Sequence, residues 1–341
     1  MNTDTAVMVC GHGSRDDDAI REFQAMVGQL EGRLAGVPVG SGFLEFARPT
    51  IRESLDALVA RGAKRILAVP GMLFAAGHVK NDLPWELNSF AAENPSVTVE
   101  YGRDLAIDPK LLEAARDRLI EAERAARPGI ERADTLLLVV GRGTNDPDAN
   151  SNVSKVTRML WEGLGYGWAE TAYSGVAHPR TDAGLARAVR LGFKRIVVFP
   201  YFLFTGVLVK RIYAAADAMA AVQPDVEIVK APYLNDHPRV LEAFIDRVRE
   251  CESGDNVMNC RVCKYRVQMI GYEGEVGTPQ AGHHLHVRGI GTDGDHAHSH
   301  AHEHGHHHHG HDHGHHHHSH DHHDDHAHGH HHDHAPARKP R

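Results

Sequence analysis

Histidine, a ligand for divalent metals, is distributed very unevenly along this chain of 341 residues. All but four of its 31 histidines lie between His283 and His334, interspersed with Asp, Gly, Ala and Ser. Neutral imidazole suits Co, Ni, Cu and Zn, so this segment predicts metal storage or delivery. An expression tag is the alternative, but a tag is a plain block of about six histidines, whereas these runs are longer and interrupted. The tail has few apolar residues and is expected to be disordered without metal.

The histidines outside this tail are His12, His78, His178 and His237. A single histidine is more often structural than functional, but glycines on both sides of His12 allow its backbone to approach a ligand closely. His78 lies in a glycine-containing loop, and Glu45 ends a predicted strand. Two imidazoles and one carboxylate suit a divalent cation that must later be released, because a closed tetrahedral cage would retain it.

Apolar runs and helical spacing predict the elements that position these side chains. The expected order is strand 5–10, helix 17–35, strand 37–46, helix 49–61, strand 66–69, helix 80–93, strand 97–101 and helix 109–126. Such alternation is typical of an α/β fold whose parallel sheet is covered by helices on both faces. Ligand sites in these sheets lie beyond the carboxyl ends of the strands. We therefore expect His12, Glu45 and His78 to meet at one edge.

The sequence before the tail contains an internal repeat. The matched segments are Ala6–Ser14 with Leu136–Thr144, Arg61–Pro70 with Leu191–Pro200, Leu73-Phe74 with Leu203-Phe204, and Val79-Lys80 with Val209-Lys210. Ser41-Gly42 and Ser174-Gly175 form a further apparent match in the second strand. The repeat predicts two tandem domains at 1–130 and 131–252, followed by a cysteine-containing segment at 253–282 and the tail at 283–341.

The second copy lacks the candidate metal ligands of the first. Arg142 stands where His12 would fall and Leu208 replaces His78, while His178 lies near the position matched by Glu45. The second copy is therefore expected to close the cleft rather than to bind metal. Its basic side chains suit an anionic substrate, although ordinary surface charge is the alternative for each. These candidate carboxylate contacts are Arg142, Arg180 and Lys210.

Composition argues against several other classes of protein. The net charge is −8 with no basic cluster in the body, which speaks against nucleic-acid binding. No apolar stretch approaches the roughly 20 residues of a membrane span, and the start of the chain lacks the features of a signal peptide, so we expect a cytoplasmic protein. Gly11-His-Gly13 lacks the third glycine of a dinucleotide motif, and there is no Walker loop, so no nucleotide cofactor is expected.

Three motifs of the first half carry a resemblance to a known family, namely Val9–Arg15, Gly42–Pro49 and Val69–Lys80. Together they resemble the CbiX-type sirohydrochlorin cobaltochelatases. The similarity extends to Pro200–Lys210 and covers roughly residues 5–270. It is greatest to the long form, which has two chelatase domains and a histidine-rich C-terminal tail.

The resemblance implies ATP-independent insertion of Co²⁺ into sirohydrochlorin during cobalamin biosynthesis. It also implies that His12 binds the metal and accepts pyrrole protons and that His78 is the second ligand. Contacts to the tetrapyrrole are implied for Glu45 and for Leu73, Phe74, Ala75, Ala76, Gly77 and His78. Two alternatives stay open: insertion of iron or nickel instead of cobalt, and a cobalt or nickel storage and delivery protein whose α/β body is only a scaffold.

Four cysteines complete the set of residues that could do chemistry. Cys10 lies in an apolar strand pattern and is expected to be a small buried thiol. Cys260 and Cys263 form a C-x-x-C motif after the second domain, with Cys251 nearby, which is compatible with a redox pair, a zinc site, an iron–sulfur cluster or no site. The resemblance also implies a possible 4Fe–4S centre at this C-x-x-C motif, because some long-form members of the family are associated with one. Because a cluster normally has four thiolates, a homodimer partner or a tail histidine would have to supply the fourth ligand.

Overall fold

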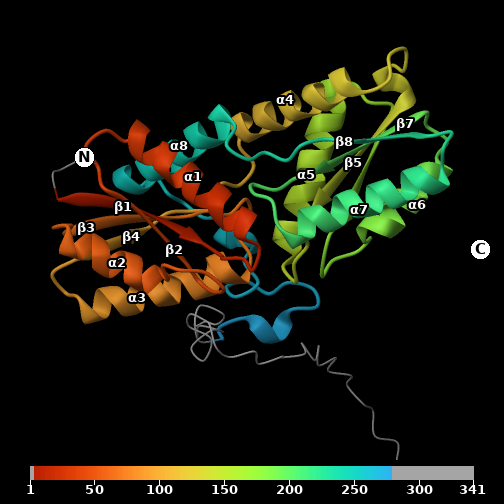
Figure 1. Ribbon diagram of the computed structural model, residues 1–341. Helices are drawn as coiled ribbons and strands as arrows, with labels where there is room; N and C mark the ends of the chain where they lie inside the picture. The colour runs from red at the N-terminus through yellow and green to blue at the C-terminus, as the bar shows by residue number, and fades with distance from the viewer. Residues whose placement is uncertain (1–3, 279–341) are drawn as a thin grey trace, which may run out of the picture. The chain divides into compact units, whose positions relative to one another are not determined.

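The computed structural model describes residues 4–278, which form two halves of similar architecture (Figure 1). The first half contains β1 (Thr5–Gly11), α1 (Asp17–Arg33), β2 (Val39–Phe43), α2 (Ile51–Ala60), β3 (Arg65–Pro70), α3 (Leu83–Glu93), β4 (Thr98–Tyr101) and α4 (Pro109–Ala125). The second half contains β5 (Thr135–Gly141), α5 (Pro147–Leu164), β6 (Trp168–Tyr173), α6 (Thr181–Arg190), β7 (Arg195–Pro200), α7 (Val207–Val222), β8 (Glu227–Lys230) and α8 (Pro238–Ser253). The predicted disordered tail at 283–341 lies outside the described residues.

Each half is built on a parallel sheet of four strands, in the orders β2-β1-β3-β4 and β6-β5-β7-β8. All seven residues of the central strands β1 and β5 are buried, as expected for parallel strands covered on both faces. Successive side chains of β1 alternate between two clusters, with Val7 and Val9 facing α1 and with Ala6 and Met8 facing α2 and α3. The predicted fold class, two α/β chelatase-like halves, is confirmed.

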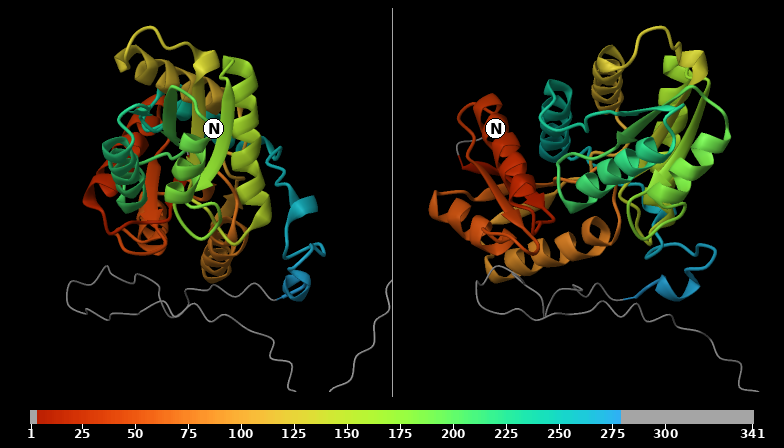
Figure 2. Two further views of the ribbon diagram at one scale, coloured as in Figure 1. Left: turned by 90° about the vertical axis from the view of Figure 1, so that its right-hand side faces the viewer. Right: turned by 45° about the vertical axis from the view of Figure 1, so that its right-hand side comes forward.

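The last helix of each half packs against the other half. Helix α4 contacts α5, β7 and β8, while α8 contacts α1 and β3 (Figures 1 and 2). Both helices place apolar residues, among them Leu111 of α4 and Phe244 of α8, in one cluster that also contains Val9 of the first sheet and Leu137 of the second. The two repeats therefore share one hydrophobic core, and neither sheet is fully covered by helices of its own repeat.

Equivalent lysines of the two repeats, Lys80 and Lys210, each pair with an aspartate of the other half. Lys80 Nζ lies 2.8 Å from Oδ2 of Asp146, the N-cap of α5, and Lys210 Nζ lies 2.7 Å from Oδ2 of Asp16, the N-cap of α1. Lys80 is 6% exposed and Lys210 is 53% exposed. The same contact is therefore buried on one side of the interface and open to solvent on the other.

The structure corrects one part of the predicted repeat. Ser41 pairs with Val9 on β1, and the equivalent partner of Val139 on β5 is Thr171, so Ser41 corresponds to Thr171 rather than to Ser174. The Ser-Gly match was wrong because a short dipeptide can recur by chance, whereas the ladder register fixes the true alignment.

A membrane-spanning helix needs about 20 predominantly apolar residues. Among the described residues, no helix combines enough length and apolar character to cross a membrane.

Candidate metal centre

His12, Glu45 and His78 come together at the carboxyl edge of the first sheet, as their positions in the sequence predict. One donor atom from each residue lies within 4.8 Å of the others. His12 Nε2 is 3.3 Å from Oε1 of Glu45, and the two imidazole rings meet edge to face with centroids 4.4 Å apart. Within residues 4–278 this is the only group of three or more His, Cys, Asp or Glu side chains close enough to hold one ion. The arrangement offers nitrogen and oxygen ligands on one side and leaves the other side open.

Backbone contacts bring the loop of His12 against the loop of Glu45. The amide of Glu45 donates to the carbonyl of His12 at 3.1 Å, which continues the pairing of β1 with β2 beyond the strands. Gly13 has a φ of 96°, and a Cβ at this position would lie 1.7 Å from the Glu45 carbonyl oxygen. Only glycine fits there, so the glycine after His12 permits the close approach that places the imidazole beside the carboxylate.

The hydrogen bonds of the two imidazoles define which ring nitrogens remain for a metal. His12 Nδ1 lies 3.0 Å from the carbonyl oxygen of Gly13, and His78 Nδ1 lies 2.8 Å from Oδ2 of Asp82. A carbonyl oxygen only accepts hydrogen bonds, so His12 Nδ1 carries the proton; the same holds at His78 when the Asp82 carboxylate is ionised. In this state the Nε2 atoms of both rings keep lone pairs for a cation.

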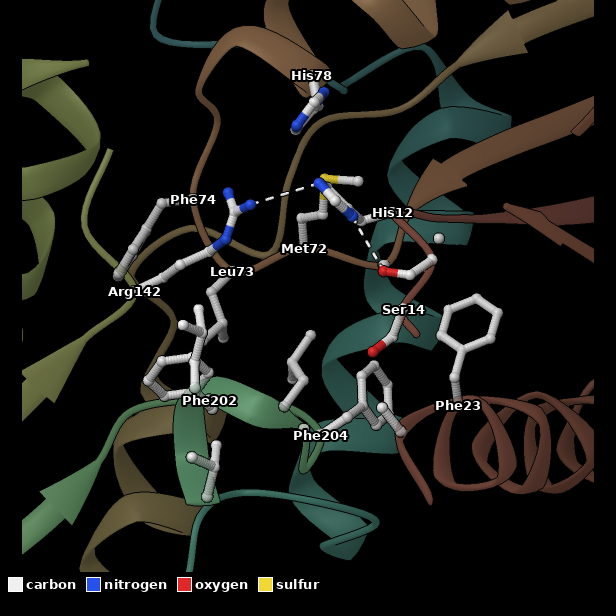
Figure 3. Close-up of a pocket in the computed structure, with 18 of the residues that line it drawn as sticks. His12, Ser14, Phe23, Met72, Leu73, Phe74, His78, Arg142, Phe202 and Phe204 are labelled. Carbon is white, nitrogen blue, oxygen red and sulfur yellow. Dashed lines mark hydrogen bonds between the residues drawn. The ribbon is translucent and has the colours of Figure 1, made fainter. Parts of the chain in front are cut away.

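The second half contributes Arg142 to this centre, and it has no equivalent of the three candidate metal ligands. Arg142 reaches across the cleft and donates from Nη2 to Nε2 of His12 at 3.3 Å (Figure 3). The backbone pairing makes Gly175, not His178, the counterpart of Glu45, because the Glu45 amide donates to the His12 carbonyl and the Gly175 amide donates to the equivalent Arg142 carbonyl. All three ligand positions of the first half are therefore replaced in the second, by Arg142, Gly175 and Leu208. His178 is exposed and stands apart from the cluster.

His12 and His78 of this cluster line a cavity of about 470 Å³ between the halves. Most of its wall is apolar, with aromatic side chains from both halves: Phe23, Phe46, Phe74, Tyr201, Phe202 and Phe204. Phe74 stacks on Tyr201 with centroids 5.9 Å apart, and Phe23 meets Phe204 edge to face at 5.5 Å. Such a cavity, apolar with a few convergent polar groups, suits a flat organic ligand bearing polar atoms that face His12 and His78.

The loop predicted to contact the substrate faces the cavity in part. Leu73, Phe74, Ala76 and His78 line its wall, and Figure 3 shows Leu73 and Phe74 on the side opposite Phe23. The amide of Ala75 instead donates to the buried Asp104 at 2.9 Å, and Gly77 lies beside Tyr265 of the segment after α8. Burial raises the pKa of the Asp104 carboxyl to about 6. The loop is thus supported from behind by residues outside the predicted site.

The three basic candidates lie in different surroundings. Arg142 lines the cavity, whereas Arg180 and Lys210 are not among its lining residues. Arg180 is the N-cap of α6, and Lys210 pairs with Asp16 and Asp18. The geometry brings Arg142 to the candidate metal cluster, and the substrate contacts of all three residues stay predictions.

The cysteines near the end of the second half do not gather into one site. Cys251 is buried in α8, where its thiol donates to the carbonyl of Glu100 at 3.6 Å and burial raises its pKa to about 12. Cys260 begins a short 3₁₀ turn farther along the chain, and Cys263 directly follows it. In the described part of the chain, these cysteines are not a three-ligand group.

Asp82 is the residue of this centre that sequence reasoning missed. Its side chain is 3% exposed and contacts His78, four residues earlier. The signal was present, since residues four apart on a helix face one another, but His78 was expected to precede the helix rather than to begin its first turn.

Fold and site define a class of protein: two α/β halves with exchanged helices that enclose a two-histidine, one-carboxylate centre at the wall of an aromatic cavity. A family model described as CbiX matches residues 6–122 and again residues 136–251. The chain is 37% identical to a sirohydrochlorin cobaltochelatase of Priestia megaterium, covering 78% of this chain and 86% of that protein. It therefore belongs to the CbiX family.

Two further relatives differ in the metal that they name. A sirohydrochlorin ferrochelatase of Bacillus subtilis is 30% identical, with 72% of this chain and 91% of that protein covered. The crystal structure of the sirohydrochlorin chelatase SirB of Bacillus subtilis in complex with cobalt superposes with a TM-score of 0.62 at 28% identity, covering 74% of this chain and 97% of that one.

Proposed function

We propose that this protein is a sirohydrochlorin cobaltochelatase that inserts Co²⁺ into its tetrapyrrole substrate without a nucleotide. The observation that carries the proposal is the cluster of His12, Glu45 and His78, of which His12 and His78 line an aromatic cavity between the halves. The similarity to a named cobaltochelatase over most of the chain supports the same reaction. We place the reaction in the cytoplasm, as part of cobalamin biosynthesis.

The metal ion is a substrate in this reaction and must be bound loosely. His12, Glu45 and His78 supply up to three ligands, with one donor atom of each within 4.8 Å of the others, and we assign Nε2 as the ligating atom of both histidines. Three ligands on one side leave coordination positions for the pyrrole nitrogens, so the metal can be transferred from the protein to the macrocycle without passing through free solution.

Metal insertion also removes two protons from the pyrrole nitrogens. His12 is placed to accept one of them, because its ring faces the cavity and neutral imidazole accepts protons near neutral pH. Glu45, 3.3 Å from His12, stabilises the imidazolium that forms. As the metal leaves His12 for the macrocycle, the same Nε2 lone pair becomes available for the proton.

The aromatic wall binds the flat macrocycle and excludes water from the transfer. Phe74 and Phe204 approach the cavity from opposite halves, so the macrocycle would lie between them with its nitrogens toward His12 and His78. Arg142 then pairs with a carboxylate of the substrate.

Iron and nickel are the alternative metals, because two imidazoles and a carboxylate bind all three ions and relatives of both cobalt and iron type are similar. A storage and delivery role is the second alternative. A protein that only stores metal has no need of the aromatic cavity, which favours the enzyme.

An anaerobic absorbance assay of sirohydrochlorin with Co²⁺ tests the proposal. We expect rapid conversion to the cobalt spectrum with the intact protein and loss of at least about 100-fold in rate with His78→Ala. His178→Ala is the matched control, since His178 is exposed and outside the cavity. Equal rates with Fe²⁺ or Ni²⁺ would change the assigned metal. Tight Co²⁺ binding without any acceleration over the uncatalysed reaction would indicate storage or delivery.

An iron–sulfur cluster at Cys260 and Cys263 is a separate proposal. Cys251 is a poor third ligand because its thiol is buried, donates to a carbonyl and has a raised pKa. Iron and sulfide bound after anaerobic purification should therefore fall in Cys260→Ser and stay unchanged in Cys251→Ala. Absence of both elements from the intact protein would remove the cluster from consideration.

A further inference from the structure

The turn that carries His78 has an unusual backbone. Residues His78–Asp82 form a π-helical turn directly before α3, in which the amide of Leu83 donates to the carbonyl of His78, five residues back. A π turn arises when one extra residue is inserted in a helix, and such turns are frequent at functional sites.

The second half provides an internal comparison for this turn. Lys80 corresponds to Lys210, and Asn94, which follows α3, corresponds to Gln223, which follows α7, so the first half has one residue more between them. Helix α7 is a regular α-helix over this stretch, and Leu208 stands at the position of His78. The extra residue is therefore present in the half that has the histidine and absent from the half that lacks it.

Two contacts fix the backbone of the turn without touching the imidazole. Tyr101 donates from its hydroxyl to the carbonyl of Val79 at 2.9 Å, and Lys80 pairs with Asp146 of the second half at 2.8 Å. The lysine contact has an equivalent at Lys210, where there is no π turn. Inter-half pairing thus does not explain the extra residue.

Asp82 acts on the ring itself. Its Oδ2 lies 2.8 Å from His78 Nδ1, and its Oδ1 accepts from the Asn81 side-chain amide at 3.1 Å. The Asp82 side chain is only 3% exposed. Burial of a carboxylate is costly unless hydrogen bonds compensate it, so a buried acid at this position is best explained by what it does to His78.

We infer that Asp82 is the positioning residue that makes His78 an effective metal ligand. The inference rests on the proposed function, in which His78 binds the metal through Nε2. The carboxylate holds the Nδ1–H tautomer, directs Nε2 toward His12 and Glu45, and increases the electron density on the ligating nitrogen. The π turn accommodates one extra residue at the point where His78 and Asp82 pair, while α3 keeps its buried face. Asp82 itself contacts neither metal nor tetrapyrrole in this arrangement.

The test compares Asp82→Asn with the intact full-length protein. Asn keeps the volume of Asp but loses the charge, so we expect the dissociation constant for Co²⁺ and the KM for Co²⁺ to rise about 10- to 100-fold. The kcat at saturating Co²⁺ should stay within about threefold, because the proton acceptor His12 is unaffected. Asp82→Glu restores the charge and should bind Co²⁺ more tightly than Asp82→Asn.

We expect the tail histidines to bind cobalt as well, so the centre must be measured by difference. The visible absorption of Co²⁺ bound to full-length His78→Ala gives the signal of the tail and is subtracted from that of each variant. Asp104→Asn is the matched control, because Asp104 is another buried carboxylate that supports the same loop but contacts Ala75 rather than the imidazole. It should leave the Co²⁺ affinity and spectrum unchanged.

The outcomes separate this inference from the proposed function. An Asp82→Asn protein with a lowered melting temperature but an unchanged Co²⁺ affinity and spectrum would overturn the inference, as would equal losses in Asp104→Asn. If Asp82→Asn weakens Co²⁺ binding while the intact protein fails to metallate sirohydrochlorin, the positioning role stands and the proposed function is wrong.

Discussion

Arg142 of the second half donates a hydrogen bond to Nε2 of His12 in the first half, across 3.3 Å (Figure 3). This nitrogen is the one that a metal ion needs, because the other ring nitrogen of His12 is engaged by the carbonyl of Gly13. A guanidinium and a divalent cation therefore compete for the same lone pair and repel each other. In the proposed reaction this competition would keep metal binding reversible, and the arginine would turn to a substrate carboxylate when the metal binds.

Replacing Arg142 should separate its two effects. In Arg142→Gln we expect Co²⁺ to bind about threefold to tenfold more tightly, because the competing charge is gone. The KM for sirohydrochlorin should rise about tenfold, since a charge-assisted contact to a carboxylate is lost. Cobalt titration and the anaerobic absorbance assay measure the two constants.

Arg180→Gln is the control for Arg142→Gln. It also tests the prediction from the sequence that Arg180 contacts a substrate carboxylate. Arg180 is not among the residues that line the cavity, so its replacement should leave both constants unchanged. An equal rise in KM in the two variants would mean that the charge of the second half, rather than the position of Arg142, attracts the substrate.

Lys80 and Lys210, the equivalent lysines of the two repeats, should differ sharply in their contribution to the free energy of unfolding. Lys80→Met removes the partner of Asp146, whose side chain is fully buried, and should lower the free energy of unfolding by about 3–5 kcal/mol. Lys210→Met removes an exposed contact and should have almost no effect. Urea denaturation followed by circular dichroism measures both. Equal losses would show that the ion pairs contribute by joining the halves and that burial is unimportant.

The buried Asp104 should make stability depend on pH. Burial raises the pKa of its carboxyl to about 6 in the folded protein, from an ordinary value of 3.8, against the opposing charges of Arg103 and Lys80. The folded state thus holds its proton more tightly, and this group makes the protein less stable as pH rises from about 4 to 7. Asp104→Asn removes that dependence and keeps an acceptor for the Ala75 amide.

The measurement for Asp104 is the difference in free energy of unfolding between variant and wild type across pH. It should be small near pH 4 and should favour the variant by about 2–3 kcal/mol near pH 8. A difference that stays constant across this range would contradict the assigned titration.

Much of this fold follows from the sequence because its signals are local. Continuous apolar runs such as 5–10 predict buried parallel strands, and glycine after a strand marks the loop at its carboxyl end. Because the carboxyl ends of parallel strands share one edge of the sheet, the sequence alone predicts that His12, Glu45 and His78 lie together. The structure places one donor atom of each within 4.8 Å of the others.

Features that depend on tertiary packing were beyond such reasoning. The apolar face of α4 is evident from its sequence, but a helical pattern does not say which sheet the face covers, so the exchange with α8 was not predicted. The ion pair of Lys210 with Asp16 was not predicted, because the two residues are distant in sequence; its predicted substrate contact stays a prediction. Asp82 was missed because the helix was expected to begin at residue 80, so His78 and Asp82 were not recognised as residues four apart in one helical turn.

The segment after α8 belongs structurally to the body rather than to the tail. Asn256 donates to the carbonyl of Tyr101 at 2.7 Å, and the Tyr265 hydroxyl would lie 3.6 Å from a Cβ added at Gly77, next to His78. Lys264 is 2% exposed, and its ammonium group lies over the rings of Tyr265 and Tyr272 at 5.1 and 4.9 Å. These contacts support the loop of the metal centre from outside the cavity.

Two truncations should therefore behave differently. A chain ending at residue 282 loses the histidine-rich tail, and we expect fewer bound Co²⁺ ions per chain with a nearly unchanged rate at saturating Co²⁺. A chain ending at Ser253 also loses the contacts of Asn256 and Tyr265, so its melting temperature should fall by several degrees and its saturated rate by about tenfold or more. Metal analysis, thermal unfolding and the absorbance assay on the same samples distinguish the two losses. A collapse of the saturated rate in the chain ending at residue 282 would mean that the tail takes part in the insertion step. Full activity of the chain ending at Ser253 would show that the loop of His78 needs no support from this segment.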